Sequence, residues 1–391
     1  MAPFHRERGG LIGYSEVGTN GRTRPTAAME MSPAIWSRLP DDLLDRILAL
    51  LPLHSLLSLR STCKRFRSLL LSPSFISQLK SNSQRPTAYF LLSHPQFSHS
   101  FLPLYDSAVD SWRKLPISIS TSSSFQLLSS SSGLLCFSIS HPCSSFSSLL
   151  VYNLVTLSSK IIASPNKSSC PAILISYPSP SPHGYKIYLP SSSSASFFLY
   201  NSDCSSWTRF PLLEPLLALT NTHQDPVFFN DFLYFTTPEP FSVVGFDLNA
   251  GKWGTEVAPD LPPELAFVRL VSSDEGKRLF LVGGVGRDGI SRSLKVWEMV
   301  GTEHCRWEEV GRLPEMMCRK FVSVCYHNYS HVYCLWHQGI LCVCCTTWPE
   351  VLFYNLGRGT WHWLPKCPLL QEKWSCGFRW FSFAPDLYAM V

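Results

Sequence analysis

The chain has 391 residues, of which 45% are hydrophobic and only 16% are charged, with a formal net charge of +5. This length and apolar content predict a folded protein with two or three domains. The positive charge is spread along the chain, which argues against direct binding of nucleic acid. The chain begins with a polar, basic segment and holds no run near the ~18 apolar residues of a membrane span. We therefore expect a cytoplasmic and/or nuclear protein without membrane contact.

The first 80 residues divide into two segments of different composition. Residues 1–34 mix Gly, Thr, Arg and Pro with little apolar content, which predicts disorder. Residues 35–80 are rich in leucine and favour three short helices. In the first helix, apolar residues recur at helical spacing and the charged ones, Asp41, Asp42, Asp45 and Arg46, fall on the other side.

Proline and capping residues indicate where these helices begin and end. Pro40 suits the first turn of a helix, and Pro52 ends it because proline lacks the N–H that a helix interior needs. The expected second helix carries Leu53, Leu56, Leu57 and Leu59. A third is expected to have Ser61 or Thr62 at its N-cap and to turn Cys63, Phe66, Leu69 and Leu70 inward. From the linker after these helices to the end of the chain, no strong helix is expected.

The helical segment resembles an F-box, with two Leu-Pro pairs, apolar pairs one turn apart, and a late Arg, Cys-Lys and aromatic. Phe66 stands where the family often has Trp. The resemblance implies docking on a Skp-type adaptor, and through it on a cullin, by Leu39, Pro40, Leu43, Leu44, Ile47, Leu48, Leu51, Pro52, Leu56, Cys63, Lys64 and Phe66. A module of ~40 residues rarely buries all its apolar surface, so Leu39, Pro40, Leu43, Leu44, Ile47 and Leu51 are expected to form an exposed patch. The alternative is an ordinary leucine-rich helical hairpin that caps a larger domain.

A repeat with a steady period follows the linker. In it, an Asp or Asn after an apolar stretch precedes Trp by six residues, in the pairs Asp106/Trp112, Asn201/Trp207, Asp247/Trp253 and Asn355/Trp361. Asn153 lies six before Ser159, as in a repeat without its Trp, and Trp297 with Trp307 marks a repeat with a longer turn. The six anchors at 112, 159, 207, 253, 307 and 361 are 46 to 54 residues apart.

Each anchor predicts a β-hairpin, because the polar residue can bond into the turn and Trp can begin the returning strand and pack between sheets. Such a period fits a propeller blade, so residues 85–391 are predicted to form six blades. Gly283-Gly284 resembles the double glycine of kelch repeats. The chain thus resembles plant F-box/kelch-repeat proteins, which implies a small all-α F-box followed by an all-β kelch-type propeller.

Three further features concern the propeller. The tail CGFRWFSFAPDLYAM is expected to pair with the sheet around Tyr89 to Trp112 and close the ring; a loose edge strand is the alternative. Residues 118–148 and 164–196 are about half Ser and Pro and are expected to be long loops interrupted by LLCFS and YKIYL. A group of Cys and His from Cys318 to Cys345 could suggest zinc, but Cys342 and Cys345 lie in an apolar run where strand alternation separates neighbouring thiols. We expect buried free cysteines, and no metal or other cofactor.

The sequence shows none of the common catalytic fingerprints, so an enzyme is not expected. The family resemblance implies a substrate receptor of a Skp-cullin-F-box ubiquitin ligase, with a target protein on the propeller. One alternative is a transcriptional co-regulator that holds a transcription factor on the propeller. Another is a propeller that binds a small molecule in its central channel. Specificity for the target is expected to lie in the propeller loops, because these diverge on a constant scaffold.

Overall fold

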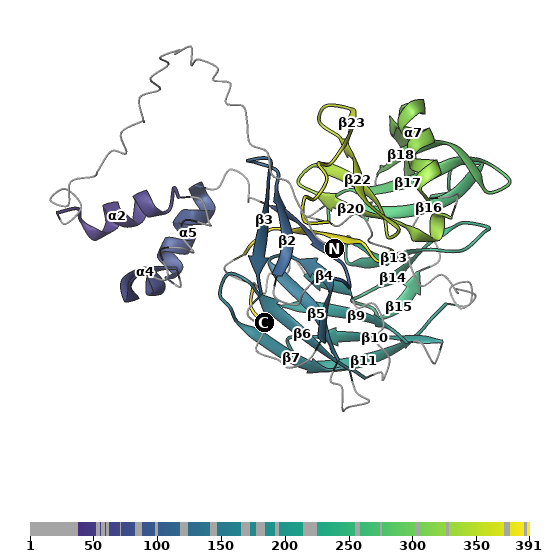
Figure 1. Ribbon diagram of the computed structural model, residues 1–391. Helices are drawn as coiled ribbons and strands as arrows, with labels where there is room; N and C mark the ends of the chain where they lie inside the picture. The colour runs from purple at the N-terminus through teal and green to yellow at the C-terminus, as the bar shows by residue number, and fades with distance from the viewer. Residues whose placement is uncertain are drawn as a thin grey trace, which may run out of the picture.

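The structure is a computed structural model. It describes residues 38–51, 55, 59, 62–70, 72–82, 88–97, 101–117, 124–140, 147–165, 173–176, 184–191, 195–213, 225–254, 259–273, 276–301, 305–325, 328–370, 376–386 and 389–391. Residues 1–34, for which we predicted disorder, lie outside this part. The described residues form a small helical region and a large β-propeller (Figure 1). No helix among them is long and apolar enough to cross a membrane.

The helical region consists of α2 (Asp41–Leu48), α4 (Lys64–Leu69) and α5 (Pro73–Asn82). The expected second helix lies mostly outside the described residues, and α5 was not predicted as a separate helix, so the prediction of three helices is not confirmed. The N-cap of α4 is Cys63, whose Sγ accepts a hydrogen bond from the Phe66 N–H at 3.5 Å. Cys63 is exposed, so it caps the helix and does not turn inward as we expected.

The propeller has six four-stranded antiparallel sheets. We number the blades along the chain and give their strands from the centre outwards. Blade 1 is β24 (Arg379–Phe383), β1 (Tyr89–Ser93), β2 (Phe101–Asp106) and β3 (Ser111–Pro116). Blade 2 is β4 (Ser124–Ser131), β5 (Leu134–Ser140), β6 (Ser147–Asn153) and β7 (Ser159–Ala163). Blade 3 is β8 (Ile173–Ser176), β9 (Tyr185–Pro190), β10 (Ser196–Asn201) and β11 (Ser206–Pro211).

The second half of the ring follows the same plan. Blade 4 is β12 (Val227–Phe229), β13 (Phe232–Thr236), β14 (Val243–Asp247) and β15 (Lys252–Gly254). Blade 5 is β16 (Leu265–Ser272), β17 (Leu279–Arg287), β18 (Ile290–Val300) and β19 (Arg306–Arg312). Blade 6 is β20 (Val332–His337), β21 (Ile340–Cys345), β22 (Trp348–Asn355) and β23 (Thr360–Trp363). The prediction of six blades is confirmed.

The ring closes through the end of the chain. Strand β24 pairs antiparallel with β1 over five residues, from Tyr89 opposite Phe383 to Ser93 opposite Arg379. Blade 1 therefore takes its innermost strand from the C-terminal end of the sequence and its other three from the beginning of the propeller, as the tail sequence predicted. The alternative of a loose edge strand is wrong.

The polar anchors each organise the turn between the two outer strands of a blade. The side-chain oxygens of Asp106, Asn153, Asn201 and Asp247 accept hydrogen bonds from the backbone N–H two residues on, at 2.7 to 3.1 Å. Asn355 does the same for the N–H of Arg358, at 3.1 Å. The side chain thus satisfies a turn N–H that the sheet leaves without a partner.

The tryptophans occupy one register position in five blades. Trp112, Trp207, Trp253 and Trp361 each lie opposite the aromatic residue that precedes the polar anchor, and Trp307 lies opposite Met299. Each belongs to the apolar cluster between its own blade and the preceding one. The cluster between blades 1 and 2, where Ser159 takes this position, instead contains Phe137 and Phe383. Trp297 lies one strand further in, on β18, opposite Leu281.

The double glycine lies in the middle of β17, where neighbouring side chains approach the backbone closely. A Cβ at Gly284 would lie 2.0 Å from the Ser291 Oγ and 2.5 Å from the Phe267 ring, and one at Gly283 would lie 2.8 Å from Leu265. Both distances at Gly284 are below 3.0 Å, the shortest separation at which a Cβ normally contacts another heavy atom. A side chain there would force the packing between β16, β17 and β18 apart.

Two expectations about the propeller are wrong. An eleven-residue helix, α7 (Glu315–Cys325), lies between blades 5 and 6 and buries Cys318, Phe321 and Cys325 at helical spacing. An ion pair holds it to blade 6, since the Lys320 Nζ lies 2.6 Å from a carboxylate oxygen of Glu350. Lys366, which follows β23, contacts the same carboxylate at 3.0 Å. Burial alone would raise the pKa of Glu350, but these hydrogen bonds lower it below its usual value. The second error concerns the serine-rich stretches 118–148 and 164–196, which contain the innermost strands β4 and β8 and not only loops.

Candidate docking surface and central channel

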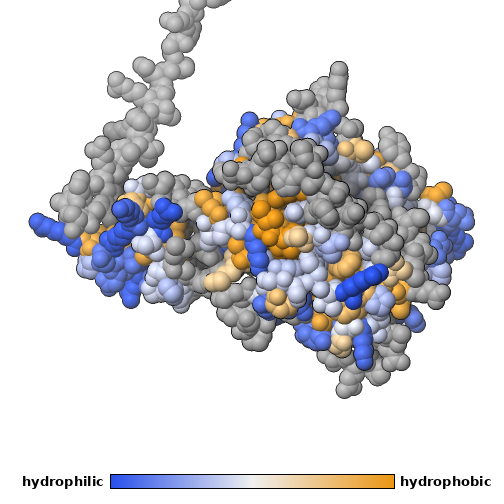
Figure 2. Space-filling view, turned by 90° about the horizontal axis from the view of Figure 1, so that it is seen from below, coloured by the Kyte–Doolittle hydropathy of each residue, from blue (hydrophilic) through white to orange (hydrophobic). Residues whose placement is uncertain are grey.

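The apolar face of α2 is only partly covered. Leu43 is 41% exposed, Ile47 38% and Leu50, just after the helix, 71%. Pro40 is exposed, and Leu39, Leu44 and Leu51 are half-buried. Figure 2 shows apolar side chains in orange among the charged ones of this region, at the left of the view. A cluster of exposed apolar residues on one short helix is typical of a partner site.

The other residues assigned to adaptor binding lie in different environments. Leu48 is buried with Ala49, Leu70 and Phe75 in the core of the helical region, so its side chain does not reach the surface. Phe66 packs against the same core and is half-buried, while Cys63 and Lys64 are exposed. Pro52 and Leu56 lie outside the described residues. Arg65 links α4 to α2 through an ion pair with Asp41 at 2.8 Å.

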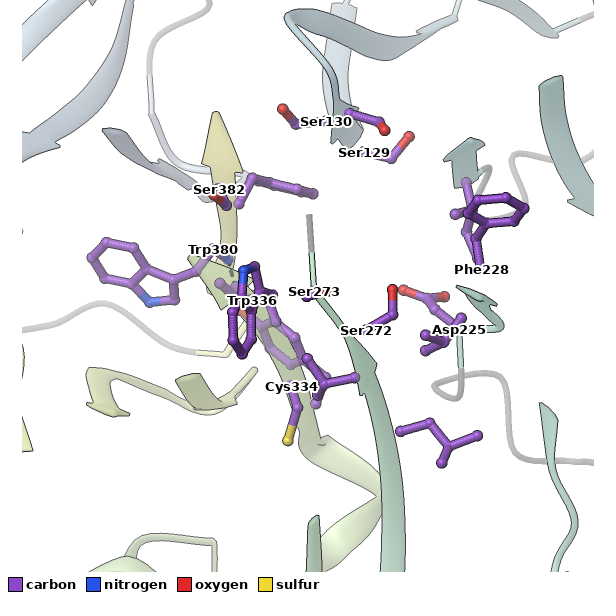
Figure 3. Close-up of a pocket in the computed structure, with 18 of the residues that line it drawn as sticks. Ser129, Ser130, Asp225, Phe228, Ser272, Ser273, Cys334, Trp336, Trp380 and Ser382 are labelled. Atoms are coloured by element: carbon purple, nitrogen blue, oxygen red, sulfur yellow. Dashed lines mark hydrogen bonds between the residues drawn. The ribbon is translucent and has the colours of Figure 1, made fainter. Parts of the chain in front are cut away.

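The second candidate site is the channel at the centre of the propeller. It is a cavity of about 390 Å³ lined by the innermost strand of every blade, and Figure 3 shows the side chains that surround it. At the end where these strands begin, Arg379 of blade 1 and Asp225, just before blade 4, form an ion pair with Nη2 and Oδ2 3.3 Å apart. Blades 1 and 4 are opposite each other in the ring, so the ion pair spans the channel.

Serines line the channel toward the other end. Ser129 to Ser132 come from blade 2, Ser272 and Ser273 from blade 5, and Ser382 from blade 1. The first group was not predicted from the sequence, because a serine-rich stretch is typical of a loop. The signal that could have found them is the mostly apolar segment Phe125 to Leu128 directly before these serines, which lies at the position of an innermost strand.

Comparison with known proteins places the chain in a family. Residues 36–78 match the F-box domain family. An F-box/kelch-repeat protein of Arabidopsis thaliana is 51% identical over 379 residues, which cover 94% of this chain and 92% of that protein. The chain belongs to the F-box/kelch-repeat family. The family resemblance that the sequence motifs indicated is thus confirmed.

Two more distant likenesses accompany this match. Protein ABERRANT PANICLE ORGANIZATION 1 of Oryza sativa subsp. japonica is 29% identical over 408 aligned positions, which cover 93% of this chain and 91% of that protein. Among solved structures, TolB from Acinetobacter baumannii aligns with a TM-score of 0.45 and 10% identity, over 83% of this chain and 73% of that one.

The described thiols of this F-box/kelch-repeat protein do not form a site. Cys318 and Cys325 lie on α7, whereas Cys342 and Cys344 face blade 1 from β21 and Cys345 faces blade 5. Burial raises the pKa of Cys334 to about 12 and that of Cys342 and Cys344 well above the usual value, which keeps these thiols protonated. None of the twelve cysteines in the described part is in a disulfide, and no group of His, Cys, Asp and Glu there is arranged to hold a metal ion.

Proposed function

We propose that this protein is the substrate-recognition subunit of a Skp-cullin-F-box ubiquitin ligase. The observation that carries the proposal is the F-box match over residues 36–78, with a partly exposed apolar α2, in one chain with a closed propeller. The helical region would dock on a Skp-type adaptor, and through it on a cullin, and the propeller would hold the target protein.

In this role the chain supplies no reacting group. Holding the target beside the ubiquitin-transferring machinery raises the effective concentration of its lysines, and proximity accounts for the acceleration. Such a role requires two separate surfaces on one rigid scaffold. It also predicts a protein of the cytoplasm and/or nucleus, which imaging of a fluorescent fusion would test.

The topology favours one face of the propeller for the target. The chain enters β1 at Tyr89, opposite Phe383 at the end of β24, so the F-box is attached on the face where the innermost strands end. Helix α7 lies on the other face, because it connects the outermost strand of blade 5 to the innermost strand of blade 6. Met316 on this helix is 75% exposed. We infer that the target binds on the α7 face.

The test is co-purification of a Skp-type adaptor with the full-length chain. Changing both Leu39→Ala and Pro40→Ala should abolish adaptor recovery, since one anchor of an interface typically contributes on the order of 2 kcal/mol, a factor of about thirty in affinity. The matched control is Ile161→Ala with Ile290→Ala, which truncates two exposed apolar residues of the propeller and should leave recovery unchanged. Wild-type recovery with the first pair would contradict the proposal.

A second measurement distinguishes degradation from co-regulation without degradation. Proteins captured by the propeller should accumulate in cells that carry the Leu39→Ala, Pro40→Ala variant, because the target would still bind but would no longer be brought to the ligase. Unchanged abundance of every captured protein, together with retained binding, would favour a co-regulator that only holds its partner.

A further inference from the structure

The central channel has the size of a binding site for a small molecule. Its 390 Å³ would hold about thirteen waters at ~30 Å³ each, and it falls toward the lower end of the ~300–1,000 Å³ typical of ligand pockets. All six blades contribute to the wall. A ligand inside would therefore contact elements that are rigidly held by the closed ring.

The charge on the wall is confined to one end. Among the described residues that line the channel, Arg379 is the only Lys or Arg and Asp225 the only carboxylate. Their contact is a single one at 3.3 Å, and the side chain of Arg379 is 23% exposed whereas that of Asp225 is 41% exposed. Arg379 is thus the more enclosed partner, and Asp225 can be solvated by water if the contact opens.

An incoming carboxylate could replace Asp225 at low cost. A guanidinium can donate two parallel hydrogen bonds to a carboxylate, which is stronger than one long contact. A partly exposed ion pair contributes little to stability, because water and salt screen it. Exchange of Asp225 for a ligand would therefore improve the hydrogen bonding of Arg379 while returning Asp225 to solvent.

Further along the channel, the wall offers apolar and aromatic surface. Phe228, Leu270 and Trp336 come from three different blades, and Figure 3 shows Trp336 and Phe228 on either side of the space. The ring of Trp336 stacks on Phe280 with centroids 5.3 Å apart and planes 11° apart, which fixes its orientation. Such a wall suits a ring system better than a flexible polar chain.

We propose that the channel binds a small organic acid with a ring-containing apolar body, whose carboxylate pairs with Arg379 in place of Asp225. This function goes beyond the recognition of a protein target and does not depend on it. The carboxylate lies at the α7 end of the channel, because β24 begins there. The body extends along Trp336 toward the serines.

Two probes of the same shape and different charge test this proposal on the full-length chain. Calorimetry should show that 2-naphthoate binds about tenfold more tightly than the neutral 2-naphthamide. Arg379→Gln should remove this preference by weakening naphthoate alone. Trp336→Ala should weaken both probes. The control Arg319→Gln, on α7 and outside the channel, should change neither affinity.

Asp225→Asn gives a result of opposite sign, so it remains informative if Arg379→Gln fails to fold. Removing the competing carboxylate should tighten naphthoate about tenfold and leave naphthamide unchanged. The proposal is overturned if wild-type protein binds both probes equally, if naphthoate fails to bind at ~1 mM, or if Asp225→Asn has no effect on naphthoate. Persistence of the preference in a folded Arg379→Gln variant would also overturn it.

Discussion

The helical region and the propeller differ in how much of their apolar surface each buries alone. Among described residues, the helical region buries four apolar side chains, Leu48, Ala49, Leu70 and Phe75, and leaves Leu43, Ile47 and Leu50 exposed. The propeller buries one apolar cluster at each of its six blade interfaces. The difference shows which region can be stable without a partner.

Each region's stability thus has a different source. A domain of ~40 residues has too little core to exceed the entropy cost of folding by much. The propeller distributes its core around a closed ring, so every blade is supported on both sides. We expect partner binding to stabilise the helical region strongly and the propeller hardly at all.

The largest effect should follow from opening the ring. Ending the chain at residue 378 removes β24 and leaves blade 1 without its innermost strand. Because blades 6 and 2 then lose the surface that β24 covers, the cooperative thermal transition of the propeller should disappear. A synthetic peptide of residues 376–391, added in trans, should restore it. A truncated chain that melts like the full-length one would show that closure by β24 is dispensable.

Large-to-small changes in the two cores compare the regions directly. Phe75→Ala and Phe137→Ala each remove a ring that is at most 1% exposed, and each should cost about 3–5 kcal/mol. In the helical region this exceeds the available stability, so Phe75→Ala should abolish amide protection in residues 62–82, while the propeller remains folded. Phe137→Ala should lower the propeller transition without removing it. Hydrogen exchange read by mass spectrometry would measure both.

The sequence predicted the repeated parts of the molecule best, because a repeat supplies several copies of one signal. The polar anchor and the Trp six residues on appear in four copies, which was enough to locate six hairpins and the closing strand. The elements missed were those without this repeated signal. Helix α7 was hidden because Cys318 and Cys325, which lie on its buried face, were considered as metal ligands. Strands β4 and β8 were hidden because serine and proline are common in loops.

The sites were harder to predict than the fold. Leu48 follows the same helical spacing as Ile47, and only the position of α5, through Phe75, determines which of them is buried. The pairing of Arg379 with Asp225 joins residues 154 positions apart. No local pattern contains that information, since the contact exists only because six blades form a ring.

A pH effect should be confined to the propeller. His337 is 1% exposed, stacks on Phe90 with centroids 3.7 Å apart, and has its Nδ1 2.9 Å from the Ser382 Oγ. Burial lowers the pKa of His337 to about 3, against about 6.5 in the unfolded chain. Between these values the unfolded state binds more protons. The free energy of unfolding should therefore fall as pH drops below 6.5, by up to about 1.4 kcal/mol per unit.

Denaturant titrations at several pH values between 7.5 and 5 would measure this slope. His337→Phe should flatten it, because the variant has no imidazole to protonate there. His362→Phe, which removes an exposed histidine of β23, is the matched control. Equal slopes in wild type and His337→Phe would contradict the assignment. His337 belongs to the propeller, so amide protection in the helical region should not follow the titration of His337.

The smallest predicted effect separates two tryptophans that occupy the same position in different blades. Trp253 donates its Nε1–H to the Pro211 carbonyl of the preceding blade at 2.9 Å, whereas the buried Nε1 of Trp112 has no hydrogen-bond partner among the described residues. Both rings are half-buried.

Replacing either tryptophan with Phe removes a similar volume, so the packing losses of the two variants largely cancel. Trp253→Phe also loses a hydrogen bond that contributes about 1 kcal/mol, while Trp112→Phe removes a donor that was buried without compensation. In urea titrations of the full-length chain, Trp253→Phe should therefore be the more destabilised variant by about 1 kcal/mol. An equal loss in both would mean that the tryptophans stabilise the blade interfaces by packing alone.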